Sequence, residues 1–197
     1  MPNVTDRIAV VRTYLELLER PAASSDISWP NGITLRREAP CSVALARSVY
    51  AAVGRIYHWY DRDAWTDERL AAQMADPNVA VWVLRDASRP IGYFELSTGS
   101  DSPLGSDSAI LAESDPGVES DPSVEIAYFG LIPAAQGKGL GKRLLEAAIR
   151  AGFDTPASRV WLHTCTLDHA AALPNYRARG FVPFRTERYE IARPATT

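Results

Sequence analysis

The segment from Gln136 to Gly141, Gln-Gly-Lys-Gly-Leu-Gly, constrains the fold more than any other part of the chain. It follows an apolar run that ends at Pro133 and supplies the first turn of a segment whose apolar residues recur at helical spacing. Glycines let the backbone approach a ligand closely, and the free N–H groups of a helix start suit a pyrophosphate. Lys138 and Lys142 add positive charge. The pattern therefore predicts a strand, a phosphate-binding turn and a helix.

The segments around this turn predict an α/β (α+β) fold with a mixed sheet. A strand at 159–166 follows the helix and completes a βαβ unit, whose right-handed crossover makes its two strands parallel. Val79–Leu84 and Pro90–Ser97 predict a hairpin. The remaining predicted elements are a strand at 33–37, a helix after Pro40 with apolar residues spaced from Leu45 to Tyr60, a short helix from Thr66, a last helix at 170–179, and one or two closing strands at 181–192.

The first thirty residues predict a helical extension. Ile8, Val11, Leu15 and Leu18 recur at three- and four-residue spacing, and Pro21 ends this pattern. Residues 22–31 are rich in serine and proline and indicate a linker. We therefore expect residues 1–30 to be an N-terminal helix and linker, and residues 31–197 to be a single domain. The extra helix is a candidate contact for a homodimer.

Composition narrows the class of ligand. The net charge is −3, which offers no broad cationic surface for nucleic acid. The two cysteines, Cys41 and Cys165, lack C-x-x-C spacing, so neither a disulfide framework nor a metal site is indicated. No apolar stretch approaches the roughly 20 residues of a membrane-spanning helix, and no signal peptide is visible. We expect a cytoplasmic protein with a small ligand.

Other phosphate-binding loops fail at defined positions of the glycine-rich segment. A Walker A loop requires glycine at Gln136 and serine or threonine at Arg143, and the dinucleotide fingerprint lacks its last glycine at Lys142 or Leu144. These mismatches argue against a nucleoside triphosphate or NAD. A plain glycine-rich turn without a ligand remains the alternative.

The segment Gln136–Gly141, placed after a strand that ends in Pro133, resembles the Q-x-x-G-x-G acetyl-CoA-binding motif of the GNAT (GCN5-related) N-acetyltransferase superfamily. Downstream, residues 168–181 resemble the second motif of the family, with Ala172, Tyr176 and a closing Gly180-Phe181. The resemblance covers about residues 33–192 in order of elements and is specific between 124 and 181. It implies a GNAT-like sheet, mostly antiparallel with a splayed parallel pair and flanked by helices.

The resemblance also implies a donor site for acetyl-CoA. In the family, the pantetheine arm lies between the splayed strands and bonds to the backbone of the first, which here implies Leu131 and Ile132. The N–H of Ile132 would polarise the thioester carbonyl. The implied donor-binding residues are Leu131, Ile132, Gln136, Gly137, Lys138, Gly139, Leu140, Gly141 and Lys142.

Two side chains have implied catalytic roles. Glu125 stands where several relatives place a carboxylate general base, which an acceptor needs because an alkyl ammonium is mostly protonated at neutral pH. Tyr176 matches the tyrosine that can protonate the departing thiolate. The alternatives are a structural carboxylate for Glu125 and simple packing for Tyr176.

Several residues are open to more than one interpretation. His169 stands where the family often has an asparagine that contacts pantetheine, and it is either a polar substitute for that residue or a solvent-facing or capping histidine. Cys165 near the cleft admits an acetyl-cysteine intermediate, although a buried cysteine is usually an apolar filler. An aromatic cluster between the two early helices is a candidate acceptor pocket: Tyr57, His58, Trp59, Tyr60 and Trp65. The stretch from 99 to 123 predicts an acidic loop or lid.

We therefore expect an N-acetyltransferase that transfers an acetyl group from acetyl-CoA to the primary amine of a small molecule or peptide by direct attack, without a metal. One alternative is a catalytically silent acyl-CoA-binding regulatory module. Another is an enzyme that uses a different nucleotide-containing donor.

Overall fold

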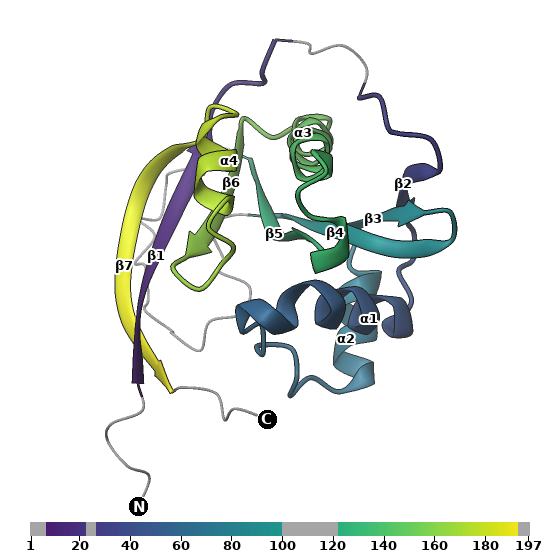
Figure 1. Ribbon diagram of the computed structural model, residues 1–197, viewed down its shortest axis with the longest axis horizontal. Coiled ribbons are helices and arrows are strands. Elements are labelled where there is room, and N and C mark those ends of the chain that lie inside the picture. Colours follow the sequence, from purple (N-terminus) through teal and green to yellow (C-terminus); the bar gives the residue numbers. More distant parts are fainter. Residues whose placement is uncertain (1–6, 23–26, 100–121, 193–197) are drawn as a thin grey trace, which may run out of the picture.

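The structure is a computed structural model and describes residues 7–22, 27–99 and 122–192 (Figure 1). Its strands form one sheet in the order β2-β3-β4-β5-β6-β1-β7. The strands are β1 (Arg7–Leu17), β2 (Ile33–Glu38), β3 (Val79–Asp86), β4 (Arg89–Thr98), β5 (Ser123–Leu131), β6 (Arg159–Cys165) and β7 (Val182–Ala192). The helices are α1 (Val43–Gly54), α2 (Asp67–Ala75), α3 (Leu140–Phe153) and α4 (Ala172–Arg177), with short 3-10 turns η1 (Arg55–Tyr57) and η2 (Pro133–Ala135).

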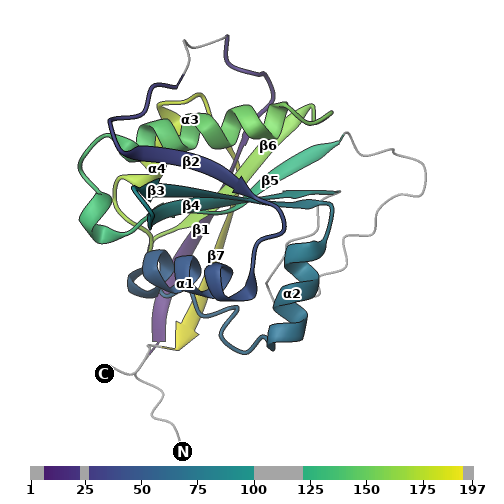
Figure 2. The ribbon, with the colours of Figure 1, turned by 90° about the vertical axis from the view of Figure 1, so that its right-hand side faces the viewer.

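The sheet is a central layer covered by helices on both faces. Figure 2 shows α3 above the sheet and α1 with α2 below it. The apolar residues of α3 turn toward the sheet, which is why Leu144 and Leu145 are fully buried. Serine and threonine begin the helices of the other face, since Ser42 and Thr66 accept hydrogen bonds from the first turns of α1 and α2. The predicted mixed α/β fold is confirmed.

The parallel pair β5 and β6 is splayed. The two strands pair only from Ser123 to Glu125 with Arg159 to Trp161. Beyond these residues β5 continues to Leu131 and β6 to Cys165 without further pairing to each other. Every other neighbouring pair in the sheet is antiparallel. The predicted geometry is therefore present, and the strands open a gap in the middle of the sheet.

The predicted N-terminal helix is wrong, because residues 7–17 form the strand β1. This strand pairs with β6 on one side and β7 on the other, and Figure 1 shows β1 and β7 running side by side. Its β-branched residues suit a strand, and its burial pattern follows neither helical spacing nor clean alternation. The boundary expected at residue 30 would separate this strand from its own sheet.

The helix predicted after Pro40 ends earlier than expected. α1 stops at Gly54, and the chain reverses through η1 and His58, whose φ of 61° is left-handed. Trp59 then packs on Gly54, where a Cβ would lie 2.2 Å from its ring. This reversal carries residues 57–61 away from the helix axis and toward the gap in the sheet.

The other elements follow the predictions, including the hairpin of β3 and β4 and a single closing strand β7. The predicted acidic loop, with Asp101, Asp107, Glu113, Asp115, Glu119 and Asp121, lies outside the described residues. Among the helices that the structure describes, none is long and apolar enough to cross a membrane.

Candidate active site

A cleft of about 900 Å³ occupies the gap between the splayed strands. It extends from the glycine-rich turn to β1 and β7 and receives residues from both layers of helices. Seven of the eleven predicted site residues line it: Leu131, Gln136, Gly137, Gly139, Gly141, Lys142 and Tyr176. The other four, Glu125, Ile132, Lys138 and Leu140, do not.

The glycine-rich turn leaves open space beside its backbone. Gly137 and Gly139 have φ values of 73° and 74°, which side chains other than glycine rarely adopt. A Cβ on either residue would meet no heavy atom within 4 Å. Gly139 caps the fourteen-residue helix α3 without a side-chain hydrogen bond, so its first N–H groups face this space. The turn therefore fits a pyrophosphate, beside which Lys142 lines the cleft.

Gln136 braces the turn. Its Nε2 donates to the Leu131 carbonyl oxygen at 3.1 Å and to the Tyr57 hydroxyl at 2.9 Å. One side chain thus ties the glycine-rich turn to the end of β5 and to η1. The structure gives Gln136 a positioning role, in addition to its place on the cleft wall.

The backbone N–H and carbonyl groups of Ile132 are both hydrogen-bonded within the protein. Its N–H donates to the Ile91 carbonyl at 2.9 Å, and its carbonyl accepts from Ala135 at 2.9 Å. The N–H is therefore not available for the carbonyl-polarising role implied for it. Because successive N–H groups of a strand point to opposite sides, those of Leu131 and Phe129 point away from β4 and toward the gap.

Glu125 is buried at the point where β5 and β6 separate. It is 4% exposed and lies opposite Trp161 in the last paired position. Burial, with a smaller contribution from the charge of Glu95, raises its pKa to about 8, while Arg12 acts in the other direction. The carboxyl group therefore exchanges its proton close to physiological pH.

His163 lies between Glu125 and the cleft. Its Nε2 is 3.9 Å from Glu125 Oε1, and the ring lines the cleft. Burial, reinforced by Arg12, lowers the pKa of His163 to about 4, so the imidazole is uncharged at neutral pH. Sequence reasoning missed this residue. The available signal was its position two residues after Trp161 on the second splayed strand, on the same face.

Tyr176 lines the cleft beside Phe129 of β5. Its ring packs edge to face on Phe129 and Phe181, at centroid distances of 6.1 and 6.2 Å. Burial raises its pKa above the usual range, so the phenol keeps its proton at neutral pH. The geometry is compatible with both the implied acid role and simple packing.

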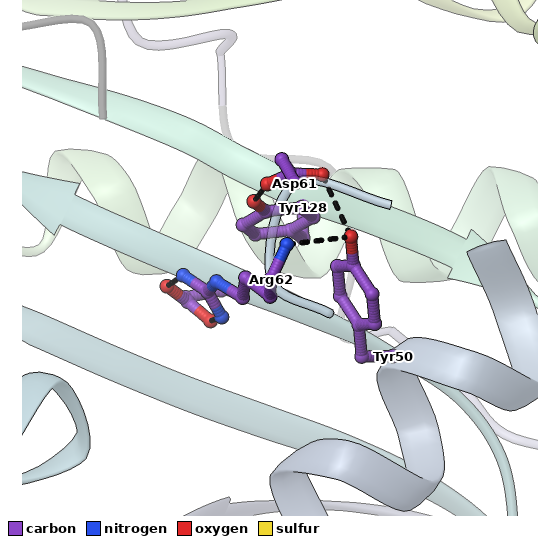
Figure 3. Close-up of polar contacts among 5 residues, drawn as sticks. Tyr50, Asp61, Arg62 and Tyr128 are labelled. Carbon is purple, nitrogen blue, oxygen red and sulfur yellow. Dashed lines mark hydrogen bonds and ion pairs between the residues drawn. The ribbon is translucent and has the colours of Figure 1, made fainter. Parts of the chain in front are cut away.

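One wall of the cleft, where the sequence predicts the acceptor pocket, is aromatic and held by hydrogen bonds. Tyr50 donates to Asp61 Oδ1 at 2.7 Å, and Tyr128 donates to Asp61 Oδ2 (Figure 3). The backbone N–H of Arg62 donates to the Tyr50 hydroxyl at 3.3 Å. Asp61 is exposed and lines the cleft. Four members of the predicted aromatic cluster line it as well: Tyr57, His58, Trp59 and Tyr60.

A buried ion pair supports this wall from behind. Arg62 and Glu95 form a bidentate pair at 2.6 and 2.8 Å, with side chains 6% and 1% exposed. The guanidinium also lies 4.2 Å from the centroid of the Tyr128 ring. Trp65, the fifth member of the aromatic cluster, stacks against Arg62 and Arg69 and lies outside the cleft lining.

The two ambiguous residues near α4 have structural partners. His169 Nδ1 accepts the N–H of Ala171 at 3.0 Å, which supports the capping interpretation, and the residue also lines the cleft. Burial raises the pKa of the Cys165 thiol, which lowers its thiolate fraction and weakens it as a nucleophile. Among the described residues there is no cluster of three or more side chains suited to a metal ion.

The splayed strands, the open glycine-rich turn and the cleft between them define a mixed α/β protein with a ligand-sized cavity in the middle of its sheet. The chain belongs to the acetyltransferase (GNAT) family, whose model matches residues 47–181. No curated protein matches the chain.

Solved structures of low identity share the fold. A GCN5-related N-acetyltransferase from Kribbella flavida is 18% identical with a TM-score of 0.53, covering 97% of this chain and 61% of its own. A GCN5-related N-acetyltransferase from Sphaerobacter thermophilus is 18% identical with a TM-score of 0.54, and the match covers 95% of this chain and 52% of that protein. An aminoglycoside acetyltransferase from an uncultured soil metagenomic sample is 16% identical with a TM-score of 0.58, covering 76% and 88%. The chain thus spans 52–61% of the first two proteins.

Proposed function

We propose that this protein is an acetyl-CoA-dependent N-acetyltransferase that acts on a primary amine by direct attack. The observation that carries the proposal is the open space beside Gly137 and Gly139, which continues into the cleft between the splayed strands. When bound, acetyl-CoA supplies an activated acetyl group as a thioester. The acceptor is a small-molecule or peptide amine, and a reducing cytoplasm suits the two free cysteines.

The residues of the turn and of β5 have binding roles in this proposal. The first N–H groups of α3 and the side chain of Lys142 hold the pyrophosphate. The N–H groups of Phe129 and Leu131 bind the pantetheine arm, and their dipoles stabilise charge that develops on the carbonyl oxygen. Gln136 keeps the turn at a fixed distance from β5 through its bond to the Leu131 carbonyl.

Proton removal from the acceptor uses His163 and Glu125. An alkyl ammonium has a pKa of about 10.4, and only the neutral amine attacks a carbonyl. Because Glu125 does not line the cleft whereas His163 does, the proton reaches Glu125 through the imidazole or a water beside it. With its pKa raised to about 8, the ionised carboxylate is a strong enough base to take this proton, and the ionised fraction grows as pH rises toward 8.

Replacing Tyr176 with phenylalanine separates its two interpretations. We expect Tyr176→Phe to lower kcat roughly 10-fold to 100-fold, because the departing thiolate loses its proton donor, and to leave the Kd for CoA unchanged. The ring contacts with Phe129 and Phe181 are retained. Steady-state kinetics and calorimetry measure both quantities. An unchanged kcat would assign Tyr176 to packing alone.

Calorimetric titration with acetyl-CoA, CoA, ATP and NAD tests the donor. Saturable binding of acetyl-CoA and CoA, without competition from ATP or NAD, is the expected result. Absence of CoA binding would overturn the proposal, and competition by ATP or NAD would favour another nucleotide-containing donor. CoA binding without transfer to any amine of a broad panel would instead support a silent acyl-CoA-binding module.

A further inference from the structure

Arg12 is a cleft-lining cation without a carboxylate partner. It projects from β1 into the acceptor side of the cleft, where its NH2 donates to the Tyr189 hydroxyl at 3.2 Å. Its Nε is buried and has no hydrogen-bond partner. Within the described residues, Arg12 forms no ion pair with any carboxylate.

The neighbouring carboxylates are engaged elsewhere. Glu187 lies opposite Arg12 in the pairing of β1 with β7, yet it accepts from the Tyr14 hydroxyl at 2.9 Å and pairs with Arg185. By contrast, the buried Arg62 has both oxygens of Glu95. The Arg12 guanidinium also lies 5.0 Å from the centroid of the Tyr189 ring, but its buried Nε–H stays without a partner, which is costly. Its planar fork suits a carboxylate.

The position of Arg12 relates it to the reacting groups. Along β6, its partner Cys165 is two residues beyond His163, which pairs with Tyr14. Two residues of a strand span roughly 7 Å. Burial is the main cause of the lowered pKa of His163. The charge of Arg12 lowers this pKa further and the charge of Asp61 raises it, so both charges act on the imidazole ring. A cation, a carboxylate and the His163 imidazole therefore line the same cleft.

We propose that the acceptor is an amine that also carries a carboxylate, an amino-acid-type substrate, and that Arg12 binds this carboxylate. The inference rests on the proposed acetyl transfer and narrows its substrate class. The amine is directed toward His163 and Asp61, while the carboxylate lies against the guanidinium. Arg12 thereby selects the acceptor and fixes its orientation, and the aromatic wall at Trp59 and Tyr128 is left to contact the substrate's side chain.

Matched substrates test this class directly. Each set holds an amino acid, its amide and its decarboxylated amine: phenylalanine, phenylalanine amide and 2-phenylethylamine, with corresponding sets for leucine and lysine. With acetyl-CoA and the full chain, we expect kcat/KM for at least one amino acid to exceed that of its amide and its amine by roughly 30-fold or more. Equal or better use of the carboxylate-free members in every set would overturn the inference.

Variants of two arginines on β1 test whether Arg12 is the cause of the preference for a carboxylate-bearing substrate. Arg12→Gln should raise KM for the preferred amino acid roughly 30-fold and change KM for the decarboxylated amine much less, and Arg12→Lys should recover part of the loss. Because Arg12 also lowers the pKa of Glu125, any change in kcat is shared by all three members of a set, and the comparison is made on KM. Arg7→Gln is the matched control, because Arg7 is an exposed residue of β1 paired with Glu190 outside the cleft lining. Equal effects of Arg12→Gln on all three members of a set would contradict a role in carboxylate binding.

Binding without donor separates this inference from the proposed function. If no amine is acetylated, the transferase proposal fails, and calorimetry with the amino acids alone decides the role of Arg12. Saturable binding by the wild-type protein that Arg12→Gln abolishes supports carboxylate recognition at this site. Absence of binding for every amino acid of the sets overturns it.

Discussion

Gly139→Asp is expected to weaken CoA binding roughly 100-fold or more, which corresponds to about 3 kcal/mol. The added side chain enters the open space at the start of α3, where no protein atom lies within 4 Å of a new Cβ. Its negative charge would stand beside the pyrophosphate, at the place where the helix dipole favours an anion from the ligand. Calorimetric titration with CoA measures the change.

Two further variants separate charge from backbone strain. Gly139→Asn has the same size without the charge, and asparagine tolerates a left-handed backbone, so it should lose less affinity than Gly139→Asp. Gly32→Asn places the same residue at another left-handed glycine, with φ of 81°, outside the cleft lining. It should leave CoA affinity unchanged. Equal CoA affinities of Gly139→Asp and the wild-type protein would show that the pyrophosphate does not bind at this turn.

Glu125→Gln is expected to lower kcat roughly 100-fold to 1,000-fold at pH 8, because glutamine cannot take the acceptor's proton. In the wild-type protein, kcat should fall as pH drops below about 8, the pKa to which burial raises Glu125. The variant should lack this ionisation. A pH profile of kcat for both proteins, under saturating substrates, makes the comparison. An unchanged profile would exclude Glu125 as the base.

The same variant should stabilise the fold at high pH. The unfolded chain ionises Glu125 near the ordinary value of 4.5, whereas the folded protein keeps it protonated up to about 8. Between these values the folded state binds more protons, so its stability falls as pH rises. Glu125→Gln removes this penalty, so it should raise the free energy of unfolding by up to about 5 kcal/mol above pH 8. Below pH 4 it should leave the free energy of unfolding unchanged. Urea unfolding at both pH values tests it, with the exposed Glu190→Gln as the control.

The donor half of the candidate site could be predicted from local sequence. The order of strand, glycine-rich turn and amphipathic helix lies within 31 residues, from Ser123 to Phe153, and its steric and hydrogen-bonding requirements are local. Six of the nine predicted donor residues line the cleft for this reason: Leu131, Gln136, Gly137, Gly139, Gly141 and Lys142. Leu140 is instead buried in the core, as the helical period of α3 requires.

The backbone role expected of Ile132 failed for a reason that no local pattern contains. Whether an N–H of β5 faces β4 or the gap depends on the register between the two strands, and the bulge in their pairing between Glu95 and Leu96 shifts that register. The hydrogen bond from Ile132 to Ile91 follows from this pairing. Sequence resemblance identified the strand, and the register selected the residues.

The sequence by itself determined the elements whose information is local: the glycine-rich turn, the helix α3 and the apolar strands of the hairpin β3–β4. Tertiary structure alone decided that residues 7–17 are a strand, because pairing with β6 and β7 outweighs a weak helical period. It also decided the acceptor side, where Arg12 and His163 meet from segments about 150 positions apart and burial sets the pKa of Glu125. Burial and long-range strand pairing depend on the whole fold, so the chemical properties of this cleft arise only when the complete sheet has formed.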